Sequence, residues 1–296
     1  MRKILKIVGV IAVGLVAVAV LAFLAAFVSS ETRLKRTYAV EVEPIEVPSD
    51  AEMVAEGQRL ASIRGCTDCH GADLGGDVLI ADPAIGTIYA PNLTAGEGGV
   101  GQFYTDSDYL RAIRHGVASD GRGLLVMPSA EYFILSDEDA GALIAYIRSL
   151  PPVDREQPEP AIAPLGRVLF SIGQLPPLAA EVIDHDAPRP DAPQAEVSQE
   201  FGAYLATSCT GCHGLNFSGG PVPGSPPDAP QAANLTPAGD LGNWTQSDFI
   251  QTMRSGVTPE GKTLDPSVMP WPIANAMTDV ELQALWVYLN QLDPSE

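Results

Sequence analysis

A pattern of about one hundred residues occurs twice in this chain of 296 residues, with its parts in the same order. Its most distinctive part is Cys-x-x-Cys-His, at residues 66–70 and again at residues 209–213. The other matched segments are residues 92–94, 105–109, 114–117, 126–128 and 136–150, with counterparts at 234–236, 245–249, 254–257, 268–270 and 278–292. Because every segment is separated from its counterpart by nearly the same length of chain, we predict two similar domains, at residues 50–150 and 196–296.

Each repeat has the sequence pattern of short helices joined by long loops. Thr105 stands three residues before an aspartate, which fits a helix N-cap, and Gly116 stands where glycine often ends a helix. Thr278 begins a capping box that is followed by apolar residues at helical spacing. The counterparts of these residues in the other repeat follow the same pattern. Since no convincing strand pattern accompanies them, we predict an all-α fold.

A glycine occupies the helix that precedes each Cys-x-x-Cys-His motif. Glycine destabilises a helix interior, so Gly57 and Gly202 are expected to permit a close helix crossing. We predict that Gly57 packs against Tyr146 and that Gly202 packs against Trp286, on the last helix of each repeat.

Residues 7–28 form an uninterrupted uncharged run near the N-terminus. A helix of this length spans roughly 33 Å, which is enough to cross the hydrocarbon core of a membrane. Arg2, Lys3 and Lys6 precede the run and favour a cytoplasmic N-terminus. A cleaved signal peptide is the alternative, but it would have a shorter apolar core and a small-residue cleavage site. We therefore predict a single-pass anchor in the lipid of a bacterial cytoplasmic membrane, with the remainder on the periplasmic side.

The chain divides further by composition. Residues 1–36 are the predicted anchor, and residues 37–49 are expected to form a stalk above the membrane. Residues 151–195 contain ten prolines and are typical of an extended linker between the two domains. A short apolar stretch in this linker, residues 165–178, is expected to pack on one of the domains.

The chain is strongly acidic, with a formal net charge of −20. Residues 37–296 carry 11 basic and 36 acidic groups, so the excess lies outside the predicted anchor. A nucleic-acid-binding surface has to be basic, and we therefore expect no nucleic-acid partner. An acidic surface of this kind steers basic partner proteins.

The two Cys-x-x-Cys-His motifs carry the chemistry. Cys66 and Cys69, like Cys209 and Cys212, are placed to form thioethers to the two vinyl groups of a haem. The next residue, His70 or His213, would then be the proximal iron ligand. A zinc site needs four ligands, and no second cysteine pair is near either motif. A redox-active cysteine pair would not need the histidine. We predict two covalently attached haem c groups.

A methionine recurs at a matched position after each motif. Met127 and Met269 each follow a valine and precede a proline, at nearly the same separation from the motif's histidine. A lone methionine is usually core filler, but a matched pair favours ligation. The thioether of methionine suits iron opposite a histidine and raises the reduction potential. We therefore predict His70 and Met127 as one pair of iron ligands, and His213 and Met269 as the other.

With these features each repeat resembles a class I cytochrome c domain. Gly-Thr-Ile-Tyr-Ala-Pro-Asn-Leu-Thr at 86–94, Arg-Ala-Ile-Arg-His-Gly-Val at 111–117 and Met-Pro at 127–128 are similar to the cytochrome c subunits of membrane-bound alcohol and gluconate dehydrogenases. Residues 234–236 through 269–271 look similar. Those subunits typically carry three haem domains, whereas this chain has two.

The resemblance implies an acceptor for each haem histidine. Class I cytochromes use a proline carbonyl to accept the imidazole Nδ1–H, and Pro83 and Pro226 stand at equal separations after the two motif histidines. The alternative is that both are ordinary loop prolines. Arg114 and Arg254 could pair with haem propionates, or they could be exposed cations at helix ends.

Four further residues have less specific interpretations. Asn92 and Asn234 are expected to satisfy either loop backbone or a propionate. His115 is matched by a serine in the second repeat, and His185 has no counterpart, so we expect both histidines to face solvent rather than iron.

These features favour a membrane-anchored dihaem electron carrier rather than an enzyme. Two methionine-capped irons leave no coordination position for a substrate. Such a carrier, alone or as a subunit of a larger membrane complex, would take single electrons from a dehydrogenase or a quinol-oxidising complex. It would pass them to an oxidase, a reaction centre or a soluble cytochrome. One alternative is a dihaem enzyme of the peroxidase or thiosulfate dehydrogenase type, which needs one iron open or weakly ligated. The other is a structural or gas-sensing haem subunit, which needs one displaceable methionine.

Overall fold

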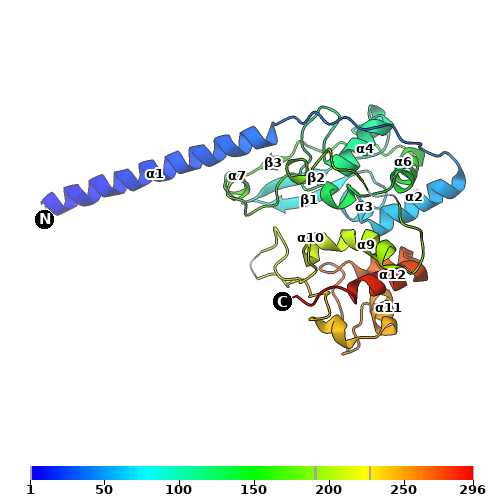
Figure 1. Cartoon of the computed structure of the whole chain (residues 1–296). Helices are drawn as coiled ribbons and strands as arrows, with labels where there is room; N and C mark the ends of the chain where they lie inside the picture. The colour runs from blue at the N-terminus through cyan, green and yellow to red at the C-terminus, as the bar shows by residue number, and fades with distance from the viewer. Residues whose placement is uncertain (1, 190–191, 227, 296) are drawn as a thin grey trace.

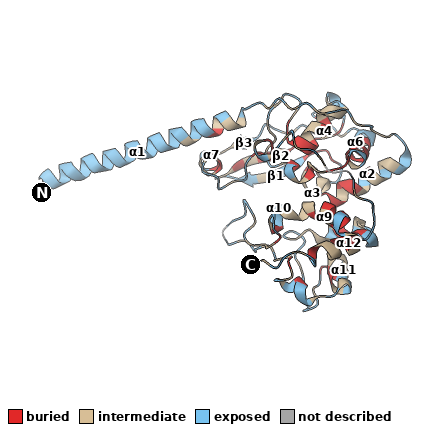
Figure 2. Cartoon of the chain, in the orientation of Figure 1, coloured by how far each residue is buried: buried red, intermediate tan, exposed pale blue. Residues whose placement is uncertain are grey.

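The computed structural model describes residues 2–189, 192–226 and 228–295. Its longest element is α1 (Arg2–Leu34), which projects from a body that holds the other helices and strands (Figure 1). The apolar part of α1 is exposed along its length (Figure 2). Among the described residues, α1 alone is long and apolar enough to cross a membrane, and it contains the predicted run at 7–28.

The first repeat folds into a helical domain. Its elements are α2 (Ala51–Ile63), α3 (Cys66–His70), β1 (Asp77–Asp82), β2 (Gly86–Ala90), the 3-10 helix η1 (Val100–Gln102), α4 (Asp106–His115), α5 (Ser129–Tyr132) and α6 (Asp137–Ser149). The first and last long helices, α2 and α6, pack against each other. Leu60, Leu110 and Ile144 are buried between α2, α4 and α6 and form the centre of the core.

The second repeat folds in the same way. Its elements are α9 (Gln199–Ala206), the 3-10 helix η2 (Thr207–Cys209), α10 (Thr210–His213), η3 (Asp240–Asn243), α11 (Gln246–Ser255), η4 (Trp271–Ala276) and α12 (Asp279–Leu289). The α9–α12 contact repeats the α2–α6 contact of the first domain. Leu205, Phe249 and Leu285 are buried in its core. The predominance of helices confirms the predicted all-α class.

The predicted helix ends are confirmed. Thr105 accepts a hydrogen bond from the backbone N–H of Asp108, whose carboxylate accepts one from the backbone N–H of Thr105. Gly116 ends α4 at a φ of 64°, in the left-handed region that glycine adopts without strain. The same box and terminal glycine bound α11, at Thr245 and Gly256. The N-caps predicted for α6 and α12 are also present.

Both predicted glycines lie at close helix crossings. A Cβ atom on Gly57 would overlap the carbonyl oxygen of Ala142 and lie 2.8 Å from the Cβ of Tyr146, so the predicted contact is confirmed. A Cβ on Gly202 would lie 2.7 Å from the Cβ of Tyr288. Our prediction of Trp286 was therefore wrong, because Tyr288 is the residue that matches Tyr146 in the repeat.

A small antiparallel sheet follows the first attachment motif, although the sequence pattern did not predict strands. In it β1 pairs with β2, and β2 pairs with the two-residue strand β3 (Ala161–Ile162) of the linker. β2 alternates between buried and half-buried residues, but both ends of β1 are exposed. The hairpin was missed because β1 has no apolar face that would give the alternating pattern.

The linker holds two short helices, α7 (Pro164–Ser171) and α8 (Ala179–Val182). α7 packs against the end of α1, where the Ser171 hydroxyl donates to the carbonyl of Ala26 at 2.7 Å. Arg33, at the C-terminal end of α1, forms an ion pair of 2.6 Å with Glu181 of α8. The linker therefore connects the first domain to the base of the exposed helix.

Residues 37–49 lie along the first domain instead of standing clear of it. The backbone N–H of Tyr38 donates to Gly121 at 2.8 Å, and the Nε of Arg111 donates to the carbonyl of Val40 at 3.1 Å. Apolar side chains farther along this segment pack on the core. The base of α1 is thus held to the first domain by this segment and by the linker.

The two domains contact each other through corresponding regions of the two repeats. α2 of the first domain contacts η4 of the second, and α5 of the first domain contacts η2 of the second. α5 and η4 both follow a candidate methionine ligand, whereas α2 and η2 both lead into a Cys-x-x-Cys-His motif. The interface therefore has an approximate twofold relation between the repeats, and one hydrophobic cluster continues through it.

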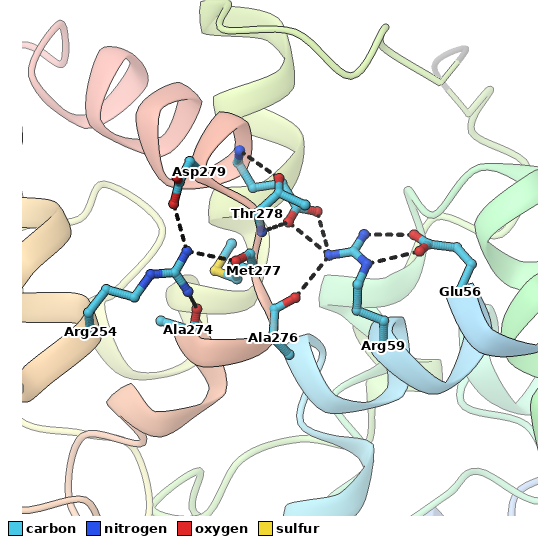
Figure 3. A network of polar contacts seen from close by, with 9 residues as sticks. Glu56, Arg59, Arg254, Ala274, Ala276, Met277, Thr278 and Asp279 are labelled. Carbon is cyan, nitrogen blue, oxygen red and sulfur yellow. Dashed lines mark hydrogen bonds and ion pairs between the residues drawn. The ribbon is translucent and has the colours of Figure 1, made fainter.

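Polar contacts across this interface follow the same relation. Arg59 of α2 donates to the Glu281 carboxylate at 2.8 Å, to the carbonyl of Ala276 and to Glu56 of its own helix (Figure 3). In the opposite direction, the hydroxyl of Tyr204 donates to Asp139. The first helix of each domain thus reaches the N-terminal turn of the other domain's last helix.

Candidate haem-binding sites

The first attachment motif forms its own short helix, α3. Gly65 and Gly71 flank it at φ values of 72° and 78°, so the chain turns sharply into and out of the motif. The His70 side chain is buried, and its Nδ1 lies 2.9 Å from the carbonyl oxygen of Pro91. A carbonyl only accepts, so Nδ1 carries the proton and Nε2 keeps its lone pair. This is the arrangement that a metal-binding histidine requires.

All four predicted residues of the first site line one cavity. Cys66, Cys69, His70 and Met127 line a space of about 510 Å³, part of which is open to solvent. Most of the remaining wall is apolar and consists of Leu93, Ile113, Pro128, Tyr132, Leu135, Leu143 and Ile147, together with Arg64 and Gly65. An apolar cavity with two thiols, an oriented imidazole and a thioether fits a c-type haem.

The loop that holds Met127 is fixed by backbone contacts. Val126 has a φ of 64°, and the backbone N–H of Ser129 donates to the carbonyl of Met127 at 2.9 Å. The Ser129 hydroxyl donates to the carbonyl of Ala112 in α4 at 2.8 Å. These bonds hold the methionine loop against α4 and α5.

The second attachment motif continues from η2 into α10. His213 is buried, and its Nδ1 lies 2.7 Å from the carbonyl oxygen of Ala233, so its tautomer is set as in the first site. Met269 is half-buried in the loop before η4, where its backbone N–H donates to the carbonyl of Asp265 at 2.9 Å. The indole of Trp271 lies against Gly256 and closes this loop over the end of α11.

The expected carbonyl acceptors, Pro83 and Pro226, were wrong. Pro83 lies in the turn between β1 and β2, and the carbonyl of Pro226 accepts from the backbone N–H of Ala229. Both acceptors lie farther along the chain than expected, with Pro91 at 21 residues after His70 and Ala233 at 20 residues after His213. Pro91 and Ala233 each directly precede the repeated Asn-Leu-Thr segment, which was the signal available in the sequence.

Arg114 and Arg254 hold the segment between each methionine and the last helix. Arg114 donates to the carbonyl of Leu135 at 2.6 Å and pairs with Asp137 at 2.8 Å. Arg254 donates to the carbonyls of Ala274 and Met277 and pairs with Asp279 (Figure 3). The alternative of an exposed cation is wrong for Arg114, whose side chain is fully buried because α6 begins directly over the end of α4.

Asn92 and Asn234 satisfy loop backbone. The Asn92 amide donates to the carbonyl of Val153 at 2.6 Å, and its oxygen accepts from the backbone N–H and hydroxyl of Thr94. Asn234 makes the same contacts with Ser295 and its own Asn-Leu-Thr threonine. Each asparagine therefore ties the loop after the histidine acceptor to the chain that follows the last helix of its domain.

The expectation that His115 faces solvent was wrong. Its side chain is buried under the linker, with Nδ1 lying 3.0 Å from Nδ1 of His185. Burial, and then the neighbouring His185, lower the pKa of His115 to about 4. No sequence pattern indicated this pair, because His115 and His185 are 70 residues apart and meet only through the path of the linker.

Two charged residues near the first site were not singled out from the sequence. Arg64 lines the cavity with an exposed fraction of 4%, and Glu131 of α5 faces Gly211 of the second motif. Burial raises the pKa of Glu131 to about 7, against the opposing charge of Arg64. For Arg64, the signal available in the sequence was a difference between the repeats, since Thr207 occupies the matching position in the second repeat.

The environment of the cysteines bears on the alternatives to haem. Burial raises the pKa of both the Cys66 and Cys209 thiols to about 12. A redox-active cysteine pair needs a lowered pKa, so these thiols are poor candidates for thiol–disulfide exchange. In the described parts of the chain, no group of three or more histidine, cysteine or acidic side chains is arranged to hold a metal ion.

Comparisons with known proteins agree with this geometry. The cytochrome c family model matches residues 54–151 and 201–293, which together make up more than half of the chain. The chain is 30% identical over 285 residues to the cytochrome c subunit of a quinone-linked alcohol dehydrogenase from Gluconacetobacter polyoxogenes, covering 83% of this chain and 57% of that subunit. It is 28% identical to the fructose dehydrogenase cytochrome subunit of Gluconobacter japonicus, covering 84% of this chain and 54% of that protein.

A shorter relative has a length closer to that of this chain. A diheme c-type cytochrome of Cereibacter sphaeroides is 28% identical over 251 residues, covering 72% of this chain and 79% of that protein. By contrast, this chain spans little more than half the length of the alcohol and fructose dehydrogenase subunits. The two matched segments each contain one attachment motif, and the chain belongs to the cytochrome c family.

Proposed function

We propose that this protein is a membrane-anchored dihaem electron carrier with one covalent haem c in each domain. In the first site, Cys66 and Cys69 attach the haem while His70 and Met127 ligate its iron. In the second site, Cys209 and Cys212 attach the haem while His213 and Met269 ligate its iron. The observation that carries the proposal is the single apolar cavity that contains all four residues of the first site.

The folded chain orients the residues that would ligate the two irons. A c-type haem with histidine and methionine ligands supplies an iron that accepts and releases one electron without binding a substrate. Pro91 and Ala233 orient the two imidazoles by accepting hydrogen bonds from their Nδ1–H groups. Arg114 and Arg254 hold the segments that follow the methionines, so the histidine and the methionine that would ligate each iron are both positioned by the folded chain.

The domain interface supports transfer between the two sites within one molecule. Gly211, between the cysteines of the second motif, faces the carboxylate of Glu131 on the helix after Met127. Arg64, which lines the first cavity, hydrogen-bonds to Ser208 beside Cys209. One electron would enter at one haem and leave from the other, so each transfer oxidises one partner and reduces the next by one electron.

The partners follow from the anchor and from the relatives. We infer that α1 spans a bacterial cytoplasmic membrane once and holds both domains on the periplasmic side. The donor is a membrane dehydrogenase, of which this chain is a subunit, or a quinol-oxidising complex, because the alcohol and fructose dehydrogenase relatives are described as cytochrome subunits. The acceptor is an oxidase, a reaction centre or a soluble cytochrome.

Optical spectroscopy of the full chain in detergent tests the proposal. We expect low-spin haem bands and a methionine–iron charge-transfer absorption that accounts for two haems per chain. Met127→Ala and Met269→Ala should each remove half of that absorption while leaving both haems attached. A high-spin haem in the resting wild-type protein would instead favour a dihaem enzyme of the peroxidase or thiosulfate dehydrogenase type, with one iron open to substrate.

A further inference from the structure

Arg64 lies at the domain interface, between the two attachment motifs. It follows the last turn of α2, and its carbonyl accepts a hydrogen bond of 2.6 Å from the Tyr132 hydroxyl in the wall of the first cavity. Its Nη1 donates to Ser208, the residue before Cys209, at 2.9 Å. The guanidinium lies 4.9 Å from the ring centroid of Tyr204 in α9. A single side chain therefore connects the first cavity to the second motif.

The charge of Arg64 is buried without a full set of partners. Its exposed fraction is 4%, and its Nε and Nη2 atoms are buried and make no hydrogen bond. No carboxylate forms an ion pair with it within the described ranges, although the other interface arginine, Arg59, has two. An unneutralised cation in a poorly solvated interior acts on nearby charges more strongly than a surface cation does.

The electrostatic influence of Arg64 reaches both motifs. It opposes the rise that burial causes in the pKa values of Cys66 and Cys209, which belong to different motifs. The second repeat supplies no equivalent cation, since Thr207 occupies the matching position and itself contacts Arg64. The two sites therefore share one buried positive charge.

We propose that Arg64 is a shared positioning residue that raises the reduction potentials of both haems. This inference rests on the proposed function. An oxidised haem carries one more positive charge than a reduced haem, so a buried cation beside both sites disfavours the oxidised state of each. Arg64 would thus act on the haem iron of either domain. It would act through its charge and would not ligate the metal.

The charged group that faces the same region from α5 is Glu131, which acts in the opposite direction. Its carboxylate lies beside the second motif and is half-buried there. When ionised it favours the oxidised state of a nearby haem and partly cancels the effect of Arg64. Substitutions at Arg64 and Glu131 should therefore shift the two potentials with opposite signs.

Spectroelectrochemical titration of the full chain in detergent at pH 8 tests this inference. In Arg64→Gln, we expect both titration components to move to lower potential, with the ratio of reduced to oxidised haem at a fixed applied potential falling about tenfold. Arg64→Lys keeps the charge and should keep both potentials close to wild type. Arg148→Gln, which removes an exposed arginine of the first domain, is the matched control and should move neither component.

Glu131→Gln provides a second measurement, which remains informative if the Arg64→Gln variant does not fold. It should move both components to higher potential at pH 8, where the wild-type carboxyl is ionised. If either glutamine variant keeps two low-spin haems and shifts only one component or neither, the shared role is overturned while the proposed carrier function stands. A loss of low-spin haem in the wild-type protein would instead contradict the carrier function itself.

Discussion

Gly57, which has no side chain, helps to set the position of the first candidate haem site. The carbonyl of Ala142 lies where a Cβ on Gly57 would have to be. Helices α2 and α6 therefore approach each other more closely than they could if any residue other than glycine occupied position 57. α2 leads directly into the first attachment motif, and α6 provides Leu143 and Ile147 to the cavity wall. The closeness of this crossing therefore sets where the motif lies relative to the rest of the pocket.

Substitution of Gly57 by alanine should destabilise the first domain. We expect the free energy of unfolding to fall by about 3 kcal/mol, because the helices must separate to admit a methyl group. Denaturant unfolding of the full chain, followed by circular dichroism, measures this change. Gln58→Ala alters an exposed neighbour on the same helix and should cost less than about 0.5 kcal/mol. Equal stability of the two variants would show that the crossing tolerates a side chain.

The burial of His115 makes stability depend on pH. The pKa of His115 is lowered to about 4, chiefly by burial, whereas an unfolded histidine titrates near its ordinary value. Between those values the unfolded chain binds a proton that the folded chain does not, so the free energy of unfolding falls as the pH drops from about 6.5 to about 4. The loss attributable to His115 should be about 3 kcal/mol.

Comparison of wild type with His115→Gln isolates this contribution. Urea unfolding at several pH values between 4 and 7 should show a weaker pH dependence in the variant, because it lacks the buried titrating ring. Parallel pH dependences in the two proteins would mean that His115 is protonated in the folded state as readily as in the unfolded state.

At the scale of elements, α7 places the linker at the base of α1. Ser171 contacts Ala26, which lies within the apolar run at residues 7–28, and the next residue, Ile172, is 62% exposed. Leu165 on the same helix is 50% exposed. If α1 crosses a membrane, these apolar side chains lie at the level of the lipid headgroups, where partly apolar helices are stabilised.

Fluorescence quenching in proteoliposomes tests this placement. Ile172→Trp should add emission that is quenched by lipids with bromine near the headgroup, beyond the quenching of the three native tryptophans. Val197→Trp is the control, because Val197 is also partly exposed but lies just before α9 of the second domain. Equal quenching of the two variants would place α7 away from the bilayer.

The elements also show how far the sequence alone could be interpreted. Duplication, helix caps and the attachment motifs depend on local spacing, and the caps were predicted at the correct residues. The acceptors of the histidine protons were missed because any residue can supply a backbone carbonyl, so the side chains of Pro91 and Ala233 do not mark them in the sequence. The burial of Arg114 and the contact between His115 and His185 depend on tertiary packing, which local patterns do not encode.

At the scale of the whole molecule, the domain interface was the feature least accessible to sequence analysis. The repeat predicted two similar domains, but not that α2 would contact η4 while α5 contacts η2. Arg59 and Tyr204 reach across the interface in opposite directions with different side chains, and Arg64 has no cationic counterpart in the second repeat. Duplicated domains can thus diverge at the surface where they meet while keeping equivalent cofactor sites.

The acidic surface predicts how the protein meets a separate partner. Residues 37–296 carry 36 acidic and 11 basic groups, so a basic soluble cytochrome should be attracted to the domains. Stopped-flow electron transfer to such a cytochrome should slow as ionic strength rises, because salt screens this attraction. A rate that is independent of salt would indicate a fixed subunit of a larger complex or an apolar docking patch.

The central claim is that two haems are covalently held, one by each repeat, and intact-mass analysis of the full chain tests it most directly. The account predicts a mass increase of two haem groups in the wild-type protein. It predicts one haem group in each of two double variants, Cys66→Ala with Cys69→Ala, and Cys209→Ala with Cys212→Ala. A mature wild-type chain that carries fewer than two covalent haems would contradict the account.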